Sequence, residues 1–131
     1  MVITVVAAII QNSQGEYLCC KRGDWKSAPG KWEFPGGKPE PQEALEDALV
    51  REISEELGVS IKVVRQFDRS VTEVDAVSID LVCFVAELTG SEPQASTDHS
   101  ELRWVPEAEL SKLDWAEPDL PALKRILIPF C

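Results

Sequence analysis

Hydrophobic and polar positions alternate along the chain as short apolar runs separated by polar breaks, which predicts several strands and two or three helices. Residues 2–10 form a continuous β-branched run, Asn12 to Gly15 reads as a turn, and residues 17–21 form a second apolar run. Two such runs around a turn are typical of strands. We therefore expect them to pair as a hairpin that contributes to the core.

The segment between residues 23 and 58 predicts a loop, a turn and the main helix. Residues 23–31 are polar and include Pro29 and Gly30, and the following Trp-Glu-Phe leads into Pro35-Gly36-Gly37. Residues 43–57 are rich in Ala, Leu and Glu and lack Gly and Pro, which favours a helix ending at Gly58. This helix has an apolar stripe made of Leu45, Leu49, Ile53 and Leu57.

The second half of the chain predicts more strands and two shorter helices. We expect strands over 61–71, 77–88 and 102–105, a polar loop over 90–100, a helix over 106–113 and a C-terminal helix over 119–128 capped by Asp119. Hairpins mixed with helices favour a mixed sheet covered by helices. A chain of 131 residues fits one domain, 1–131.

Charge and cysteine usage narrow the classes of partner and compartment. A formal charge of −10 argues against a broad basic face for a nucleic acid polymer, and a free nucleotide would also be repelled unless metal ions offset its charge. Cys19, Cys20, Cys83 and Cys131 form no CxxC pair, which favours reduced thiols. The first ten residues lack a basic leader and are too short to cross a bilayer. These features predict a cytoplasmic protein without a membrane span.

The expected helix brings acidic side chains together. Glu52, Glu55 and Glu56 stand at i, i+3 and i+4, so their carboxylates gather on one patch beside the apolar stripe. Exposed like charges at this spacing destabilise a helix by roughly 0.2 to 0.5 kcal/mol per pair, which a divalent cation would relieve. Hard oxygen ligands select Mg²⁺, with Mn²⁺ as a possible substitute.

The acidic patch lies within a 23-residue stretch, GKPEPQEALEDALVREISEELGV, that resembles the signature of the Nudix hydrolase family at every position. The matching residues are Gly37, Glu43, Arg51, Glu52, Ile53, Glu55, Glu56, Gly58 and Val59. The resemblance implies an α/β/α sandwich with a mixed sheet. It also implies that Glu52, Glu55, Glu56 and the Gly36 carbonyl bind the metal and that Arg51 orients a carboxylate. The alternative is a solvated helix that happens to be acidic.

Three charged residues, two within this stretch and one before it, have two interpretations each. Glu43 either caps the helix or has an indirect catalytic role. Lys38 follows the paired glycines and either meets a phosphate or is solvated. Arg22 ends the second expected strand, where MutT-type members of the family keep an arginine near the nucleotide; the alternative is a surface arginine.

The segment before the last expected strand offers a further metal ligand or base. In this family such a residue lies a few positions before a tryptophan, and the segment here is DHSELRW, residues 98–104. We expect Glu101 to take this role, with Asp98 as the second choice. His99 is the only histidine and either acts as a base or is incidental.

An apolar slot with a few polar groups is expected for the nucleobase. Its candidates are Phe34, Trp115 and Asp119. Residues 115–121 resemble the tail of bacterial CTP pyrophosphohydrolases and, more loosely, the MutT branch that cleaves 8-oxo-dGTP. In MutT an asparagine in this region reads the oxidised guanine, whereas this chain has no asparagine there. Asp119 can accept from an exocyclic amine or, if protonated, donate.

The leading hypothesis is a Mg²⁺-dependent nucleoside triphosphate pyrophosphohydrolase that clears oxidised nucleotides, in support of DNA repair, or degrades CTP-like ones. Within the family, the alternative is an ADP-ribose or dinucleoside polyphosphate pyrophosphatase, whose additional markers are absent. Outside it, the alternative is a non-catalytic nucleotide-binding module, which need not keep the full glutamate set. Apolar residues at 126–130 permit a homodimer as well as a monomer.

Overall fold

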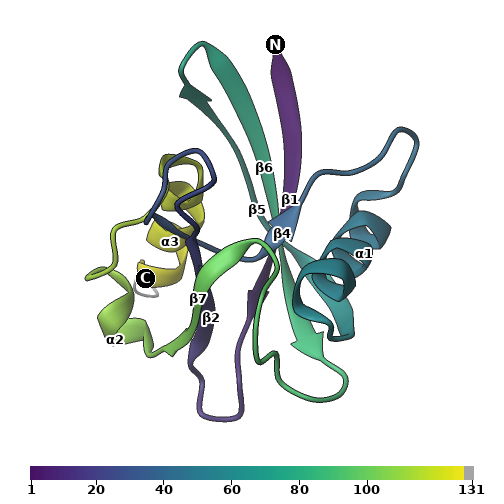
Figure 1. Cartoon of the computed structure of the whole chain (residues 1–131), viewed down its shortest axis with the longest axis vertical. Coiled ribbons are helices and arrows are strands. Elements are labelled where there is room, and N and C mark those ends of the chain that lie inside the picture. The colour runs from purple at the N-terminus through teal and green to yellow at the C-terminus, as the bar shows by residue number, and fades with distance from the viewer. Residues whose placement is uncertain (129–131) are drawn as a thin grey trace.

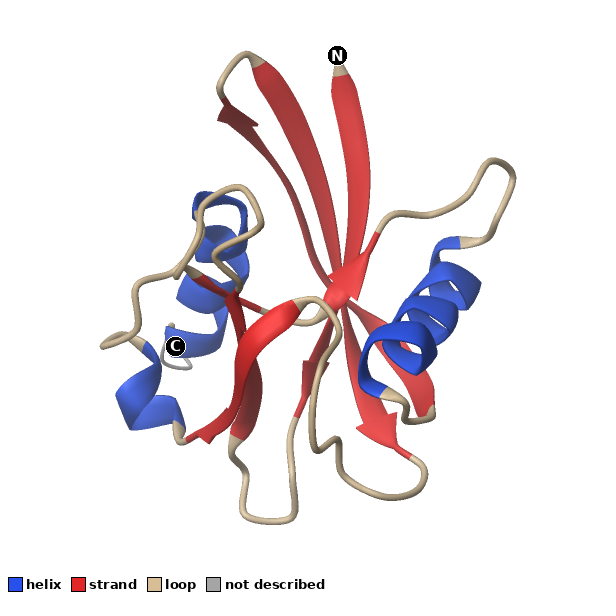
Figure 2. Cartoon of the chain, viewed as in Figure 1, coloured by secondary structure: helices blue, strands red, loops and turns tan. Residues whose placement is uncertain are grey.

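The computed structural model describes residues 1–128, whose strands form two sheets between helices (Figures 1 and 2). The larger sheet has the strand order β4-β1-β6-β5 and the smaller one β3-β2-β7. β1 runs parallel to β6 and the other ladders are antiparallel, so the larger sheet is mixed. The strands are β1 (Val2–Ile10), β2 (Tyr17–Arg22), β3 (Trp32–Glu33), β4 (Gly36–Gly37), β5 (Ile61–Val74), β6 (Val77–Leu88) and β7 (His99–Val105).

Helices lie on both sides of these strands. The long helix α1 (Leu45–Leu57) lies on one side, and α3 (Leu120–Leu127) lies on the other with the short α2 (Glu107–Leu110) and the 3-10 turn η1 (Glu117–Asp119) (Figure 2). This arrangement confirms the predicted sandwich of a mixed sheet between helices.

From Val6 to Ile10 the strand β1 is buried on both faces, which explains the apolar residues at consecutive positions there. Its residues at even positions, Val6, Ala8 and Ile10, pack in one cluster with Leu49 and Ile53 of α1. Its residues at odd positions pack on the opposite side in a second cluster that includes Ala7, Ile9, Trp115, Ala122 and Leu123. The sheet thus separates two hydrophobic cores, one under each layer of helices.

The predicted pairing of the first two strands is wrong. β1 and β2 share only an isolated bridge between Gln11 and Tyr17, and then diverge into different sheets. β1 pairs along its length with β6, whereas β2 pairs with β7. Both partners lie far along the chain, so the turn between the strands does not determine their register.

Several predicted boundaries also shift. α1 begins at Leu45 instead of Glu43, and β5 continues to Val74 because a two-residue turn at Asp75 and Ala76, both with positive φ, closes its hairpin with β6. β7 begins at His99, inside the predicted loop. The helix expected over 106–113 shortens to α2, and the one expected over 119–128 becomes η1 followed by α3.

In the described part of the chain, no helix is long and apolar enough to span a membrane. Cys19, Cys20 and Cys83 are buried free thiols. Of the apolar C-terminal segment considered for dimerisation, Ile128 is exposed, whereas Phe130 lies outside the described residues, as does Cys131.

Candidate metal and nucleotide site

Helix α1 presents the three predicted glutamates at different depths. Glu56 is buried, with 8% of its surface exposed, whereas Glu52 is half-buried and Glu55 is exposed. The helix ends where Gly58 adopts φ 67° and ψ 24°, and the Gly58 N–H donates to the Ser54 carbonyl at 3.0 Å. Glycine suits this left-handed position because it lacks a Cβ. The sequence interpretation of this helix end is confirmed.

Arg51 holds the acidic side chains around it in place. Its Nη1 donates to Glu52 at 2.8 Å and to Glu55 at 3.0 Å, and its Nη2 donates to the Lys38 carbonyl at 3.2 Å. Its Nε and Nη2 also donate to the two carboxylate oxygens of Glu43, at 2.9 and 2.8 Å. A guanidinium suits such a web because its donors are planar and permanently charged. Arg51 therefore sits where it can orient Glu52 and Glu55.

Glu43 precedes α1, and its carboxylate is occupied by Arg51. The N-cap residue is Ala44, which makes no side-chain cap hydrogen bond. Hydrogen bonds from Arg51 and from the Glu40 N–H lower the pKa of Glu43 to about 2. The Lys38 side chain is exposed. The structure therefore pairs Glu43 with Arg51 and leaves Lys38 on the exposed surface beside the glycine turn.

The paired glycines of β4 bring the turn close to both β1 and α1. A Cβ on Gly36 would lie 1.9 Å from the Val6 carbonyl oxygen, so the Gly36 backbone packs directly on β1. A Cβ on Gly37 would lie 2.0 Å from Oε2 of Glu52. Both positions therefore need the small residue, Gly36 for the sheet and Gly37 for the Glu52 carboxylate.

The loop between β6 and β7 places Asp98 against Glu56. The Thr97 N–H donates to the backbone carbonyl of Glu56 at 3.1 Å, which ties the loop to the helix. Burial, followed by the adjacent Asp98 carboxylate, raises the pKa of Glu56 to about 9. Glu101, the first choice from sequence, lies further along β7 and its carboxylate pairs with Arg103 at 2.6 Å.

The donor chemistry around α1 fits a hard divalent cation. Oε2 of Glu56 is buried and has no hydrogen-bond partner among residues 1–128, and it belongs to a carboxyl group beside Asp98. Oε2 of Glu52 is not used by Arg51 and lies over Gly37. Within the described residues, no three acidic, His or Cys side chains already converge as a complete ligand set. Binding therefore requires Glu52 and Glu55 to share their carboxylates between Arg51 and the ion.

Arg22 and His99 converge on Glu33, a residue that the sequence did not single out. Arg22 donates to Oε1 of Glu33 at 2.8 Å and makes two further bonds to Ser27, while Nε2 of His99 lies 2.7 Å from Oε2 of Glu33. Burial raises the pKa of Glu33, but the hydrogen bonds from His99 and Arg22 outweigh it and leave the pKa lowered. No local pattern predicts this cluster, since its members come from three strands.

The three residues expected around the nucleobase lie together but are buried. The rings of Phe34 and Trp115 pack with centroids 4.8 Å apart inside the second core. Asp119 is 5% exposed, makes no helix-cap bond, and accepts a hydrogen bond from the Phe34 N–H at 3.0 Å. Burial and the Glu33 charge raise the Asp119 pKa well above its usual value, against the opposing effects of the Phe34 N–H and Arg22. A protonated Asp119 can donate a hydrogen bond.

Replacing Asp119 by asparagine is expected to remove a pH dependence of stability. The folded-state pKa of Asp119 is raised, so its stabilising contribution is complete below its unfolded pKa near 3.8 and is lost as the pH rises toward the folded pKa. Each pH unit in this window lowers the free energy of unfolding by up to about 1.4 kcal/mol. Urea denaturation at pH 5 and pH 8 should show that the free energy of unfolding of Asp119→Asn, measured relative to the wild type, is higher at pH 8 than at pH 5. A constant difference would contradict the buried protonated carboxyl.

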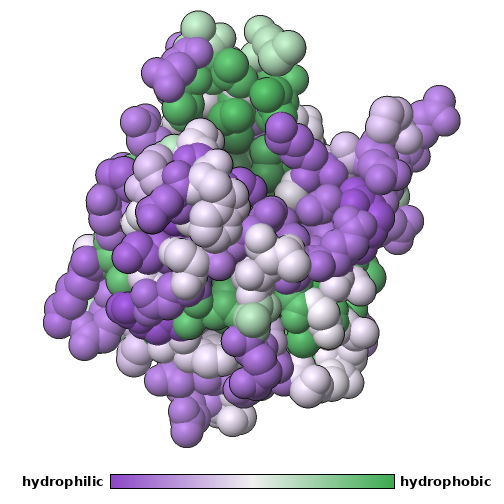
Figure 3. All heavy atoms as spheres, in the orientation of Figure 1, coloured by the Kyte–Doolittle hydropathy of each residue, from purple (hydrophilic) through white to green (hydrophobic). Residues whose placement is uncertain are grey.

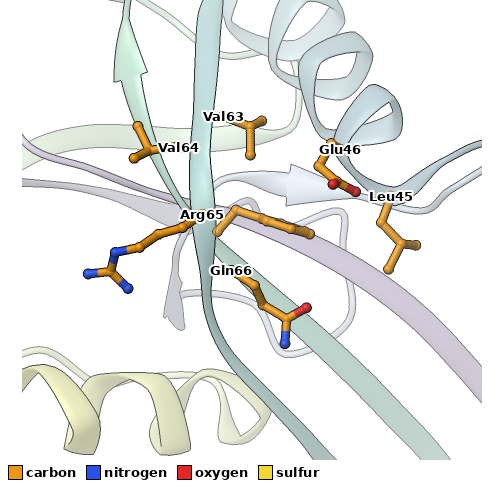
Figure 4. Close-up of a pocket in the computed structure, with 7 residues that line it drawn as sticks. Leu45, Glu46, Val63, Val64, Arg65 and Gln66 are labelled. Carbon is orange, nitrogen blue, oxygen red and sulfur yellow. The ribbon is translucent and has the colours of Figure 1, made fainter.

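Two surface clefts lie away from the acidic patch. One, of about 290 Å³, lies between the first turn of α1 and β5 and is lined by Leu45, Glu46, Val63, Val64, Arg65, Gln66 and Phe84. Figure 4 shows the Arg65 guanidinium pointing away from the helix. The other, of about 360 Å³, lies along the end of β7 and α2. Neither is lined by the glutamates that face Arg51 or Asp98.

Comparisons with known proteins find relatives by sequence and by fold. The protein-family model of the NUDIX domain matches residues 1–126 of the sequence. The chain is 35% identical over 126 residues to the CTP pyrophosphohydrolase of Escherichia coli, covering 95% of this chain and 91% of that protein. It is 35% identical over 118 residues to a putative 8-oxo-dGTP diphosphatase 2 of Mycobacterium tuberculosis, covering 89% and 82%. The crystal structure of a MutT protein from Methanosarcina mazei superposes with a TM-score of 0.86 at 25% identity, covering 95% and 92%.

Proposed function

The chain belongs to the NUDIX domain family of hydrolases, and from that premise we propose that it is a Mg²⁺-dependent nucleoside triphosphate pyrophosphohydrolase. It would release a nucleoside monophosphate and pyrophosphate from oxidised or CTP-like nucleotides. The observation that carries the proposal is the carboxylate face of α1, with buried Glu56 beside Asp98. The relatives named for CTP and 8-oxo-dGTP support a triphosphate substrate.

The proposed metal ligands are Glu52, Glu55, Glu56 and the Gly36 carbonyl, completed by Asp98. We place Asp98 before Glu101 because Asp98 lies against Glu56, whereas the Glu101 carboxylate is paired with Arg103. A bound Mg²⁺ would neutralise charge on the phosphoryl oxygens and lower the pKa of a coordinated water. Mn²⁺ has similar ligand preferences and can substitute.

The chain's own residues then orient the reactants. Arg51 holds Glu52 and Glu55 on one side of α1 and leaves Oε2 of Glu52 outside its hydrogen bonds. Lys38, exposed beside the glycine turn, can meet a phosphate. Arg22 has three of the five guanidinium N–H donors engaged, by Ser27 and Glu33, and its remaining N–H groups can reach a ligand.

The nucleobase is proposed to bind beside Asp119. Because the Phe34 and Trp115 rings are buried against each other, Phe34 contributes by holding Asp119 through its backbone N–H. The apolar face of the second core continues outward through the half-buried Val5, and Figure 3 shows apolar surface where β1, β5 and β6 project from the body. Apolar surface together with a carboxyl that can accept or donate a hydrogen bond suits a base with exocyclic groups.

Incubation with a panel of triphosphates and Mg²⁺ tests the proposed activity. We expect monophosphate and pyrophosphate as products from at least one CTP-like or oxidised nucleotide, and Glu52→Gln should lose this turnover. Release of orthophosphate alone, or equal behaviour of the two proteins, would contradict the proposal. Faster turnover of ADP-ribose or diadenosine tetraphosphate would favour the alternative within the family, and tight binding without product would favour a binding module.

The free thiols among the described cysteines support a cytoplasmic location for this activity. We propose that the substrate is a small nucleotide, because the net charge of −10 opposes a polymeric nucleic acid. We further propose that the protein is a monomer or a homodimer.

A further inference from the structure

A chain of hydrogen bonds runs from β2 to the loop that carries Asp98, and the proposed metal ligands do not account for it. Its central residue is His99, whose side chain is 1% exposed at the start of β7. Nε2 of His99 lies 2.7 Å from Oε2 of Glu33, and Nδ1 lies 2.8 Å from Oγ of Ser96. The chain ends at Asp98, whose backbone N–H donates to the same Ser96 hydroxyl at 3.1 Å.

The hydrogen bonds of this network can all form at once if each group donates to the next in a consistent order. The Glu33 carboxylate only accepts, so it takes a bond from Arg22 on one oxygen and from Nε2–H of His99 on the other. In the tautomer that carries its proton on Nε2, Nδ1 of His99 accepts from the Ser96 hydroxyl, whose oxygen accepts the Asp98 N–H. A network whose members are all hydrogen-bonded, around a buried histidine, favours one local geometry over its alternatives.

The network constrains a loop that otherwise has little to hold it. The segment between β6 and β7, residues 89–98, is mostly polar and exposed. Ser96 is tied to His99, Thr97 to the backbone carbonyl of Glu56, and the Asp98 carboxylate to Lys26 at 3.2 Å. Three consecutive residues are thus anchored to β7, to α1 and to the loop between β2 and β3, and the Asp98 carboxylate faces Glu56 as a result.

We propose that His99 is a positioning residue, which acts through Ser96 to hold the Asp98 carboxylate beside Glu56 and so sets the affinity of the α1 site for a divalent cation. This inference rests on the proposed function, since it assigns His99 and Glu33 to the support of the same metal site. Groups that hydrogen-bond to metal ligands change metal affinity by about 10- to 100-fold when they are removed. A histidine that only fills the core would leave cation affinity unchanged.

The inference can be tested without any turnover by titrating the full chain with Mn²⁺ alone and measuring the free ion by electron paramagnetic resonance. Ser96→Ala removes both bonds of the hydroxyl and is expected to weaken Mn²⁺ binding about tenfold or more. Thr97→Ala is the matched control, because its exposed side chain lies in the same loop outside the network and it should bind as the wild type does. Thermal unfolding without metal verifies that each variant is folded.

A double-mutant cycle with Asp98→Asn identifies the route of the effect. If Ser96 acts through Asp98, Ser96→Ala should cause little further loss in the Asp98→Asn background. An equal loss in both backgrounds would overturn the positioning role, and so would wild-type affinity in Ser96→Ala while the wild type binds Mn²⁺ and hydrolyses triphosphates. A wild type that neither binds Mn²⁺ nor hydrolyses any triphosphate would overturn the proposed function and this inference together.

Discussion

Replacing Glu56 by glutamine is expected to slow triphosphate hydrolysis by about a thousandfold while leaving the metal-free fold as stable as before, or more so. Metal coordination contributes several kcal/mol of transition-state stabilisation, and each 1.36 kcal/mol is tenfold in rate. The stability of the fold should not fall, because Glu56 is a buried carboxyl with an unpartnered Oε2 beside Asp98. A glutamine amide can donate to Asp98 and carries no charge.

The measurements are initial rates with Mg²⁺ and urea denaturation with and without the ion. The wild type should gain stability from Mg²⁺ because the ion binds the folded state, and Glu56→Gln should gain far less. Glu46→Gln is the matched control, since Glu46 lies exposed on the first turn of the same helix. A fully active Glu56→Gln, or one that Mg²⁺ stabilises as much as the wild type, would remove Glu56 from the proposed ligand set.

Adding one methyl group to each glycine of β4 is expected to have two different effects. In Gly36→Ala the new Cβ would lie 1.9 Å from the Val6 carbonyl oxygen and 2.7 Å from the Ala7 Cα, so it meets backbone in the middle of the sheet. Backbone cannot move aside as a side chain can, and overpacking of this kind destabilises a protein by about 1 to 3 kcal/mol or more. We expect a clearly lowered free energy of unfolding.

In Gly37→Ala the new Cβ instead meets the carboxylate of Glu52, 2.0 Å from Oε2. A flexible side chain can turn away, so the fold should lose much less stability than in Gly36→Ala. The displaced Glu52 should instead weaken Mn²⁺ binding and reduce turnover. Urea denaturation and Mn²⁺ titration of both variants separate the two effects. Equal losses of stability, or unaltered Mn²⁺ affinity in Gly37→Ala, would contradict this division of roles.

The elements were largely predictable from local pattern, and their pairing was not. The apolar run of β1 predicted its strand, and the composition of α1 and Gly58 predicted the helix and its end. The pairing of β1 with β6 joins Val2 to Ser78 across most of the domain. Because a turn between two strands need not close a hairpin when each strand finds a more distant partner, the two-sheet division could not be read locally.

The site divides in the same way. Arg51 and the glutamates of α1 fall on one helical face because 3.6 residues complete a turn, so periodicity alone places them together. Asp98 lies next to Glu56 only because the loop before β7 returns to α1, which no local spacing indicates. The sequence therefore ranked Glu101 first, whereas the structure brings Asp98 to the helix and pairs Glu101 with Arg103.

By itself, the sequence determined the helix that carries the acidic patch and the glycine turn beside it, since both depend on residues that are close along the chain. It also determined the family, because the whole signature lies within one 23-residue stretch. Only the tertiary structure decided that Asp119 is a buried carboxyl bonded to the Phe34 N–H and that His99 bridges Glu33 and Ser96. Burial and hydrogen-bond partners arise when distant strands pack, and a short run of residues does not encode which distant groups it will meet.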